Sequence, residues 1–155
     1  MFVFRMLICV VASAYAIRHL KSPADQAVGG PYCIRSIHGT YLRNAHPYGD
    51  TKVDMALRCT TPCERWTIEK LPEHALVAIK SHCTELPHTL HADQDGSVSV
   101  MRWGSHWAPF KNDDGSYSCL TWNNMLSANE NSVEAKRDIL EEWTHFWLEP
   151  VYGNE

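Results

Sequence analysis

The segment Glu142-Trp143-Thr144-His145-Phe146-Trp147-Leu148-Glu149-Pro150 is the best indicator of the fold, because imperfect copies of it occur twice earlier in the chain. The copies are Arg65-Trp66-Thr67-Ile68-Glu69 and His106-Trp107-Ala108-Pro109-Phe110. In each, a second large apolar residue follows the tryptophan two or three positions later, so that the pair can anchor a strand to a core. The three tryptophans are 41 and then 36 residues apart. A recurrence at nearly fixed spacing indicates three structural repeats.

Each repeat is predicted to contain four short strands, twelve in all. The first repeat begins with a strand from Tyr32, a turn at Gly39 and a second strand ending at Asn44. A strictly alternating segment then puts Val53, Met55 and Leu57 on one face, and Trp66 opens the fourth strand. The remaining strands are predicted at residues 76–81, 89–93, 97–101 and 107–110 in the second repeat, and at 117–122, 125–129, 132–135 and 143–148 in the third.

The three repeats share a leucine position, and one segment of the third repeat has conflicting local signals. Leu42, Leu90 and Leu126 occupy the same place in the three repeats. Residues 133–142 contain strong helix formers, so intrinsic propensity alone predicts a helix there. Because the repeat pattern requires only a strand through Ala135, we predict a strand followed by at most a helical turn near residues 136–141.

The first thirty residues are predicted to precede the folded domain. Residues 1–16 have the three features of a secretory signal: Arg5, a short apolar run at 6–12 and the cleavage pattern Ala14-Tyr15-Ala16. The apolar run is too short to span a bilayer; the alternative is a buried N-terminal strand. Residues 17–30 are predicted to be a flexible leader, 31–150 the domain and 151–155 a C-terminal tail. We therefore expect a secreted, extracellular protein.

Composition narrows the class of protein. With 155 residues, of which 45% are hydrophobic and 21% charged, the sequence is typical of one globular domain. The formal net charge is −4, and no run of lysine and arginine occurs. Nucleic acid is therefore not expected as a partner, because binding to phosphate backbones requires a basic surface.

Export would place the cysteines in an oxidising compartment. Cys9 is lost with the predicted signal, which leaves an odd number of cysteines and at most two bridges within the chain. The spacing of Cys59 and Cys63 is compatible with a local bridge, although spacing alone does not establish the geometry. We expect Cys83 to be the odd thiol, able to link two chains, and the disulfide candidates to be Cys33, Cys59, Cys63 and Cys119.

Particular residues resemble the fascin-like β-trefoil family. The resemblance is carried by Ile34-Arg35-Ser36-Ile37-His38-Gly39-Thr40-Tyr41-Leu42, by Val77-Ala78-Ile79-Lys80-Ser81 and by residues 142–149. It covers about residues 32–150 and implies an all-β fold, the β-trefoil, in which three four-stranded repeats with pseudo-threefold symmetry form a six-stranded barrel capped by three hairpins.

The departures from that family limit what the resemblance implies. The glycine and tyrosine hairpin is intact only in the first repeat. Fascins contain several trefoils and bundle actin in the cytosol, so actin is not expected as a partner of a single exported trefoil. The Gln-x-Trp motif of ricin-type sugar-binding trefoils is absent, because glutamine occurs only at Gln26 and Gln94.

Metal and catalytic sites are not predicted. The densest group of possible ligands, His82, Cys83, His88 and His91, has no standard zinc spacing. Residues 93–96 resemble a truncated calcium loop that lacks further acidic ligands, so a turn is favoured. The carboxylate pairs Asp113-Asp114 and Glu141-Glu142 are read as turn residues and as neighbours on opposite faces of a strand. No cofactor is expected, and no serine lies in a nucleophile-elbow pattern.

The best functional candidates are tryptophans outside the repeat pattern. Trp66, Trp107 and Trp143 are predicted to lie in the core. Trp103 and Trp122 have no counterparts in the other repeats and stand beside polar turn residues, where an indole can stack on a sugar or fill a pocket of a partner. The alternative for both is ordinary hairpin packing. Asn123, His46 and Tyr48 are weaker candidates for ligand binding.

The sequence thus predicts a secreted, non-catalytic, lectin-like binding module that recognises carbohydrate or a surface protein through its loops. An extracellular protein ligand or hydrolase inhibitor, acting through residues 45–52 or 83–88, is the alternative. A small hydrolase that depends on Asp93, Asp95 or Glu142 is a third hypothesis. The fold alone does not distinguish among them.

Overall fold

A computed structural model describes residues 21–45, 52–72, 75–83, 88–122, 124–137 and 141–153. The predicted signal at 1–16 lies outside the described residues. The described chain is all-β, with twelve strands, one short α-helix and two 3-10 helices. None of its helices has the length and apolarity needed to cross a membrane. The elements are α2 (Pro23–Ala27), β1 (Gly29–Ser36), β2 (Tyr41–Asn44), β3 (Val53–Ala56), η1 (Pro62–Glu64), β4 (Arg65–Lys70), β5 (Val77–Ser81), β6 (His88–Ala92), β7 (Val98–Met101), β8 (Ala108–Lys111), β9 (Tyr117–Thr121), β10 (Asn124–Ala128), β11 (Val133–Lys136), η2 (Glu141–Thr144) and β12 (Phe146–Pro150).

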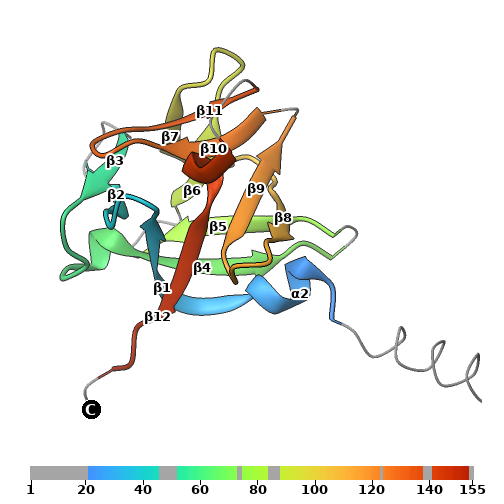
Figure 1. Ribbon diagram of the computed structural model, residues 1–155, viewed down its shortest axis with the longest axis horizontal. Helices are drawn as coiled ribbons and strands as arrows, with labels where there is room; N and C mark the ends of the chain where they lie inside the picture. The colour runs from blue at the N-terminus through green and yellow to red at the C-terminus, as the bar shows by residue number, and fades with distance from the viewer. Residues whose placement is uncertain are drawn as a thin grey trace, which may run out of the picture.

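Six of the strands form a nearly closed, barrel-like sheet (Figure 1). β1 pairs with β12 and β4, β4 pairs with β5, and β8 pairs with β9, all antiparallel. β9 meets β12 where Tyr117 pairs with Phe146. Between β5 and β8 the Val77 N–H donates to the Trp107 carbonyl over 2.8 Å, and the Trp107 N–H donates back over 2.9 Å. Pairing on both sides of these strands leaves few exposed sheet edges.

The other six strands form three hairpins, β2–β3, β6–β7 and β10–β11, which gather at one end of the barrel (Figure 1). Single bridges join each hairpin to the other two: Lys52 to Ser99, Asp54 to Ser132 and Ser97 to Glu134. Because an isolated two-stranded hairpin is marginally stable in water, this mutual contact stabilises all three.

The core lies where the hairpins meet the barrel. Trp66 and Trp107 are fully buried, and their indole N–H groups donate to the carbonyl oxygens of Leu42 and Leu90 over 2.8 and 3.1 Å. Leu42, Leu90 and Leu126 are themselves almost completely buried. The core positions of Trp66 and Trp107 are therefore confirmed, and the burial of each indole leaves no unpaired N–H donor.

The prediction for Trp143 is wrong by three residues. Trp143 is half-buried in η2, edge-on to the His38 ring at 5.5 Å between centroids. Phe146 takes the expected core position instead: it is 2% exposed and pairs with Tyr117 and Ser36, much as Trp66 pairs with Tyr32 and Ser81. An aromatic residue followed by an apolar one two positions later also describes Phe146 and Leu148, which made the register ambiguous. The helical turn predicted near residues 136–141 also lies later in the chain, as η2 at Glu141–Thr144.

Leu57, predicted to share one face with Val53 and Met55, does not follow them into the core. Val53 and Met55 are buried, as their alternation predicts, but Leu57 is 84% exposed. The strand ends at Ala56, and Leu57 lies in the bend that follows, so the period-two pattern no longer determines where its side chain points.

Residues 22–30 are not a flexible leader. The Ser22 side chain caps α2, accepting from the Asp25 N–H, and Ala24 and Ala27 are each 1% exposed within the core. α2 lies at the end of the barrel away from the hairpins, against β4 and β8 (Figure 1). The first strand then begins at Gly29. Only two small side chains of this segment are buried, so its sequence shows no apolar period from which a helix could be predicted.

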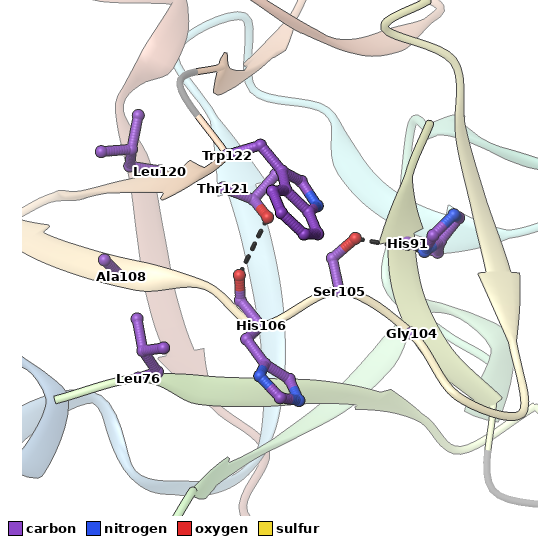
Figure 2. A pocket seen from close by; sticks show the side chains of 9 residues that line it. All are labelled: Leu76, His91, Gly104, Ser105, His106, Ala108, Leu120, Thr121 and Trp122. Carbon is purple, nitrogen blue, oxygen red and sulfur yellow. Dashed lines mark hydrogen bonds between the residues drawn. The ribbon is translucent and has the colours of Figure 1, made fainter. Parts of the chain in front are cut away.

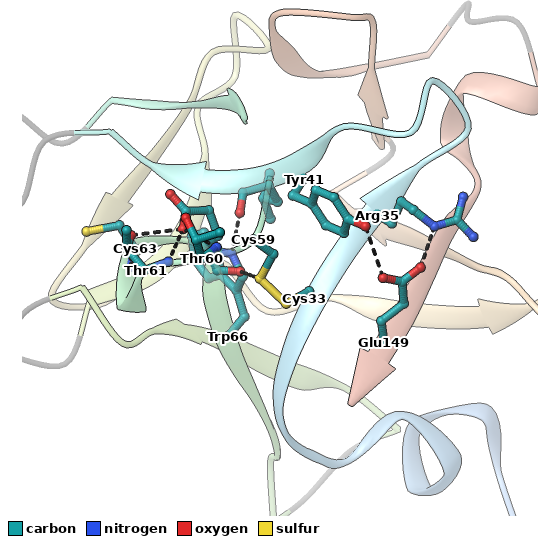
Figure 3. The surroundings of a disulfide bond; sticks show 11 residues. Cys33, Arg35, Tyr41, Cys59, Thr60, Thr61, Cys63, Trp66 and Glu149 are labelled. Carbon is teal, nitrogen blue, oxygen red and sulfur yellow. Dashed lines mark hydrogen bonds and ion pairs between the residues drawn. A yellow bond between two sulfur atoms is a disulfide. The ribbon is translucent and has the colours of Figure 1, made fainter. Parts of the chain in front are cut away.

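The disulfides join Cys33 to Cys59 and Cys63 to Cys83. Cys119 was predicted as a disulfide candidate, but it is buried and is the one free cysteine among the residues that the structure describes. The prediction that Cys83 is the odd thiol, and with it the covalent dimer, is wrong. Cys59 and Cys63 do not pair with each other, because the Cys63 sulfur points away from the Cys33–Cys59 bond (Figure 3). Burial raises the pKa of the Cys119 thiol to about 12, so this cysteine remains a protonated, inert side chain.

Candidate functional site

Trp103 and Trp122 are both exposed, as their lack of repeat counterparts predicts. Each indole-bearing residue is 82% exposed, which is unusual for the largest apolar side chain. The hypothesis of ordinary hairpin packing is therefore wrong for both. The weaker candidates Asn123, His46 and Tyr48 lie outside the described residues, as does most of the loops at 45–52 and 83–88.

The backbone at Trp122 is strained. Its φ angle is +56°, in the left-handed region, which costs a residue with a side chain about 1–2 kcal/mol. β9 ends at Thr121, whose hydroxyl donates to the His106 carbonyl over 2.9 Å and fixes the approach to the turn. Neither the exposure nor the backbone conformation favours a tryptophan at this position for stability, and such outliers concentrate at functional sites.

Trp122 borders a groove of about 530 Å³, a size typical of small-ligand sites. Figure 2 shows the apolar side chains of Leu76, Ala108 and Leu120 on one side of it, with Trp122 and His106 next to them. His91 and Ser105 line the other side. The groove therefore combines an apolar wall with a few polar groups.

A chain of hydrogen bonds fixes the polar side of the groove. His91 Nδ1 lies 3.1 Å from Ser105 Oγ, and His91 Nε2 lies 3.2 Å from an Asp93 carboxylate oxygen. Ser105 is 6% exposed, and its Oγ also accepts from the Ala92 N–H over 3.0 Å. Although serine, histidine and aspartate follow one another as in a nucleophilic triad, this serine fastens the β7–β8 connection to β6. The result is a histidine ring held in one orientation.

Two further hollows adjoin the groove. One, of about 380 Å³, is bordered by Trp103, Arg102 and Lys80 and shares Gly104 and His106 with the groove. The Arg102 guanidinium lies 5.8 Å from the Trp103 ring centroid. The other, of about 360 Å³, shares Thr121 and Trp122 with the groove. Its remaining polar lining consists of Asp93, Gln94, Asn124 and Arg137.

Gly104 explains why Trp103 points outward. A Cβ atom at residue 104 would lie 2.6 Å from the carbonyl oxygens of both Thr89 and Leu90. The next residue, Ser105, donates its N–H to the Leu90 carbonyl over 3.1 Å. The connection is thus pressed against β6 at these two residues, and the preceding indole projects into solvent.

The residues considered above as metal ligands or as catalytic groups have structural partners. Cys83 is in a disulfide and cannot coordinate a metal, His82 bonds to Thr67 over 2.5 Å, and the His88 side chain lies outside the description. No cluster of three or more possible metal ligands occurs within the part of the chain that the structure describes. Asp95 accepts from the N–H and hydroxyl of Ser97, which lowers the pKa of its carboxyl group.

The other carboxylates also lie at turns. Asp114 accepts from Ser116, and this hydrogen bond, with one from His145 Nδ1 at 2.9 Å, lowers its pKa to about 2. Glu141 and Glu142 are exposed in η2, not on the predicted strand. His106 and Leu120 were not predicted to line the groove, because each stands beside a residue that the repeat pattern assigns to the barrel.

No protein-family model matches the sequence, and no curated protein matches it. Among solved structures, the chain is similar to part of one described as "Structure and mode of action of a mosquitocidal holotoxin". The TM-score is 0.70 at 13% sequence identity, with 80% of this chain and 17% of the toxin chain covered. The similarity shows a shared all-β fold, and this chain spans less than a fifth of that protein.

Proposed function

We propose that the chain is a secreted, non-catalytic β-trefoil module that binds carbohydrate through Trp103 and Trp122. The trefoil architecture is supported by the six-stranded ring, by three hairpins that contact one another, and by the like pairings of Trp66 and Phe146. The fascin-like resemblance is part of this proposal as a relation of fold only, because core and turn residues carry it.

The observation that carries the function is the pair of exposed indoles at adjoining hollows. A pyranose ring has an apolar face of C–H groups that can cover an indole, and hydroxyl groups at its edge that need hydrogen-bonding partners. Asn124 and Arg137 border the hollow beside Trp122 and offer such partners. Rigid aromatic contacts of this kind supply binding area at a low cost in conformational entropy.

Charge favours carbohydrate over single-stranded nucleic acid, which also stacks on exposed aromatic side chains. A strand of nucleic acid requires a positive groove along its phosphates. Here Glu69 lies beside Lys80 and Arg102 in one hollow, and Asp93 lies in the same hollow as Arg137, so the lining mixes both signs of charge and forms no continuous positive track. Actin is not proposed as a partner, since two disulfides in a small domain fit an extracellular protein and actin is cytosolic.

A glycan array with the secreted protein tests the proposal. We expect binding that Trp122→Gly abolishes and that Trp103→Ala weakens. Tyr152→Ala is the matched control, because Tyr152 is 85% exposed but lines none of the three hollows. Circular dichroism and unfolding curves establish that each variant is folded.

Binding that survives both tryptophan substitutions would exclude this site. The absence of glycan binding, together with capture of an extracellular protein or inhibition of a hydrolase by the native protein, would support the protein-ligand alternative instead.

A further inference from the structure

We propose that the groove and its two adjoining hollows are consecutive subsites for one extended oligosaccharide of at least three rings, made of β1,4-linked pyranoses. This inference rests on the proposed function and specifies its ligand. It makes Trp103 and Trp122 two ends of one site, separated by the segment from Gly104 to His106, and not two independent sites.

Continuity of the lining carries the first step. Gly104 and His106 border both the central groove and the hollow of Trp103, while Thr121 and Trp122 border both the groove and the third hollow. A molecule that fills the central groove therefore reaches the other two hollows without crossing a ridge of unrelated residues. Each hollow, at about 360 to 530 Å³, is within the size range of a small-ligand site, and one sugar ring does not fill all three.

The chemistry of the lining carries the second step. The two end hollows each present an exposed indole together with charged or amide side chains, whereas the centre has the apolar wall of Leu76 and Leu120. A chain of β1,4-linked pyranoses with equatorial substituents matches this alternation, because it is a straight ribbon with flat C–H faces and hydroxyl-bearing edges. The ring faces would cover the indoles and the leucines, and the edges would meet Lys80, His106 or Asn124.

The rigidity of the site carries the third step. His91 is held by Ser105 and Asp93, and Gly104 is pressed against β6, so the central segment cannot swing away from the ligand. The backbone that carries Trp122 is also held, by the hydrogen bond from the Thr121 hydroxyl to the His106 carbonyl. Preorganised subsites lose little entropy on binding, so each additional ring should add to the affinity.

The test is the dependence of affinity on chain length. Cello-oligosaccharides and chito-oligosaccharides of one to five rings are titrated by calorimetry into the native protein, Trp103→Ala, Trp122→Gly and the control Tyr152→Ala. We expect affinity to rise up to at least the trimer and then level off. Trp103→Ala should lower trimer affinity about tenfold and leave binding of the single ring nearly unchanged, since one stacked aromatic contact has about that effect. Trp122→Gly should weaken every length.

The outcomes separate the two proposals. If another class of glycan binds and Trp122→Gly abolishes that binding, but affinity is the same for one ring and three, the extended site is wrong and the carbohydrate function stands. A silent Trp103→Ala with every oligomer contradicts the extended site in the same way. If no glycan of any class binds, the proposed function fails and this inference fails with it.

Discussion

Two connections of the chain that lead into core tryptophans are held in different ways. Residues 57–64 lead from β3 to Trp66 and are cross-linked twice, through Cys59 and Cys63 (Figure 3). Residues 102–106 lead from β7 to Trp107, contain no cysteine, and are held by Ser105 and by the close approach of Gly104 to β6. The cross-linked connection carries an exposed leucine, and the hydrogen-bonded connection carries Trp103 and borders the groove.

The first connection mainly stabilises the fold, whereas the second mainly positions side chains at the groove. In the first connection the buried Glu64 carboxylate adds hydrogen bonds from the N–H groups of Thr60 and Thr61, at 3.2 and 2.7 Å, so the segment is fixed by covalent and polar links together. In the second, a fixed backbone aims side chains outward. We expect losses of stability to concentrate in the first connection and losses of binding in the second.

The largest expected effect is the removal of a cross-link. Cys33→Ala combined with Cys59→Ala should lower the free energy of unfolding by about 2–5 kcal/mol, as loss of a native disulfide does in small secreted domains. Urea unfolding measures this change. Glycan binding by the folded variant should stay within twofold of the native value, because neither cysteine lines the groove. Cys119→Ala, which keeps both bridges, is the control, and an equal loss in that variant would contradict the role of the cross-link.

Gly104→Ala should have the next largest effect. The added methyl group would meet two carbonyl oxygens at 2.6 Å, and forced overpacking of this kind costs about 1–3 kcal/mol. Displacement of the connection should also weaken binding. Gly153→Ala is the matched control, because a Cβ there meets nothing within 4 Å and should change stability by less than about 0.5 kcal/mol. Similar unfolding curves for the two variants would show that the second connection is loosely held.

Trp122→Gly should separate stability from binding most clearly. Because residue 122 has a φ of +56°, the glycine variant should be more stable than Trp122→Ala by about 1 kcal/mol, measured by urea unfolding. Both variants should lose glycan binding. If the alanine variant is as stable as the glycine variant, backbone strain at this turn does not contribute to stability.

The smallest expected effect concerns acid. The hydrogen bonds from Ser116 and His145 lower the Asp114 pKa from 3.8 to about 2, so the stability they contribute is present above pH 4 and is lost as the pH falls toward 2. The disulfides do not titrate in this range. Thermal unfolding of Asp114→Asn should therefore depend less on pH between 4 and 2 than that of the native protein. Asp113→Asn is the control, and an identical pH dependence in native protein and Asp114→Asn would contradict this prediction.

Most of the strand order could be predicted from the sequence, because short alternating segments separated by turn residues leave few alternatives. Glycine at residues 39, 96 and 115 has positive φ in three of the hairpin turns, where turn chemistry favours it. The register of the last repeat could not be predicted, because Trp143 and Phe146 fit the same pattern. Only the pairing of β12 with β9 and β1 shows that Phe146, whose side chain has no N–H to donate, takes the core position that a tryptophan has in the other two repeats.

The candidate site was predictable only in part. Trp103 and Trp122 could be identified as candidates because the other repeats have no tryptophan at the same places. A core built from three similar repeats does not need such residues. Which residues surround them depends on contacts between strands distant in sequence, and His106 and Leu120 carry no local sign of this. The prediction that Cys83 is unpaired was wrong for the same reason. Cys83 lies in an irregular loop, and only the fold brings it close to its partner Cys63.

The buried Cys119 gives the protein an internal reporter of opening. Cys119 is 9% exposed, burial raises the pKa of its thiol to about 12, and the residue belongs to β9, one of the six barrel strands. An alkylating reagent can therefore modify it only after the strands around it separate. Under conditions where closing outpaces modification, the labelling rate equals the population of open molecules times the rate for a free thiol. Mass spectrometry of that single adduct would measure barrel opening in the absence of denaturant, with both disulfides intact and with or without an oligosaccharide in the groove.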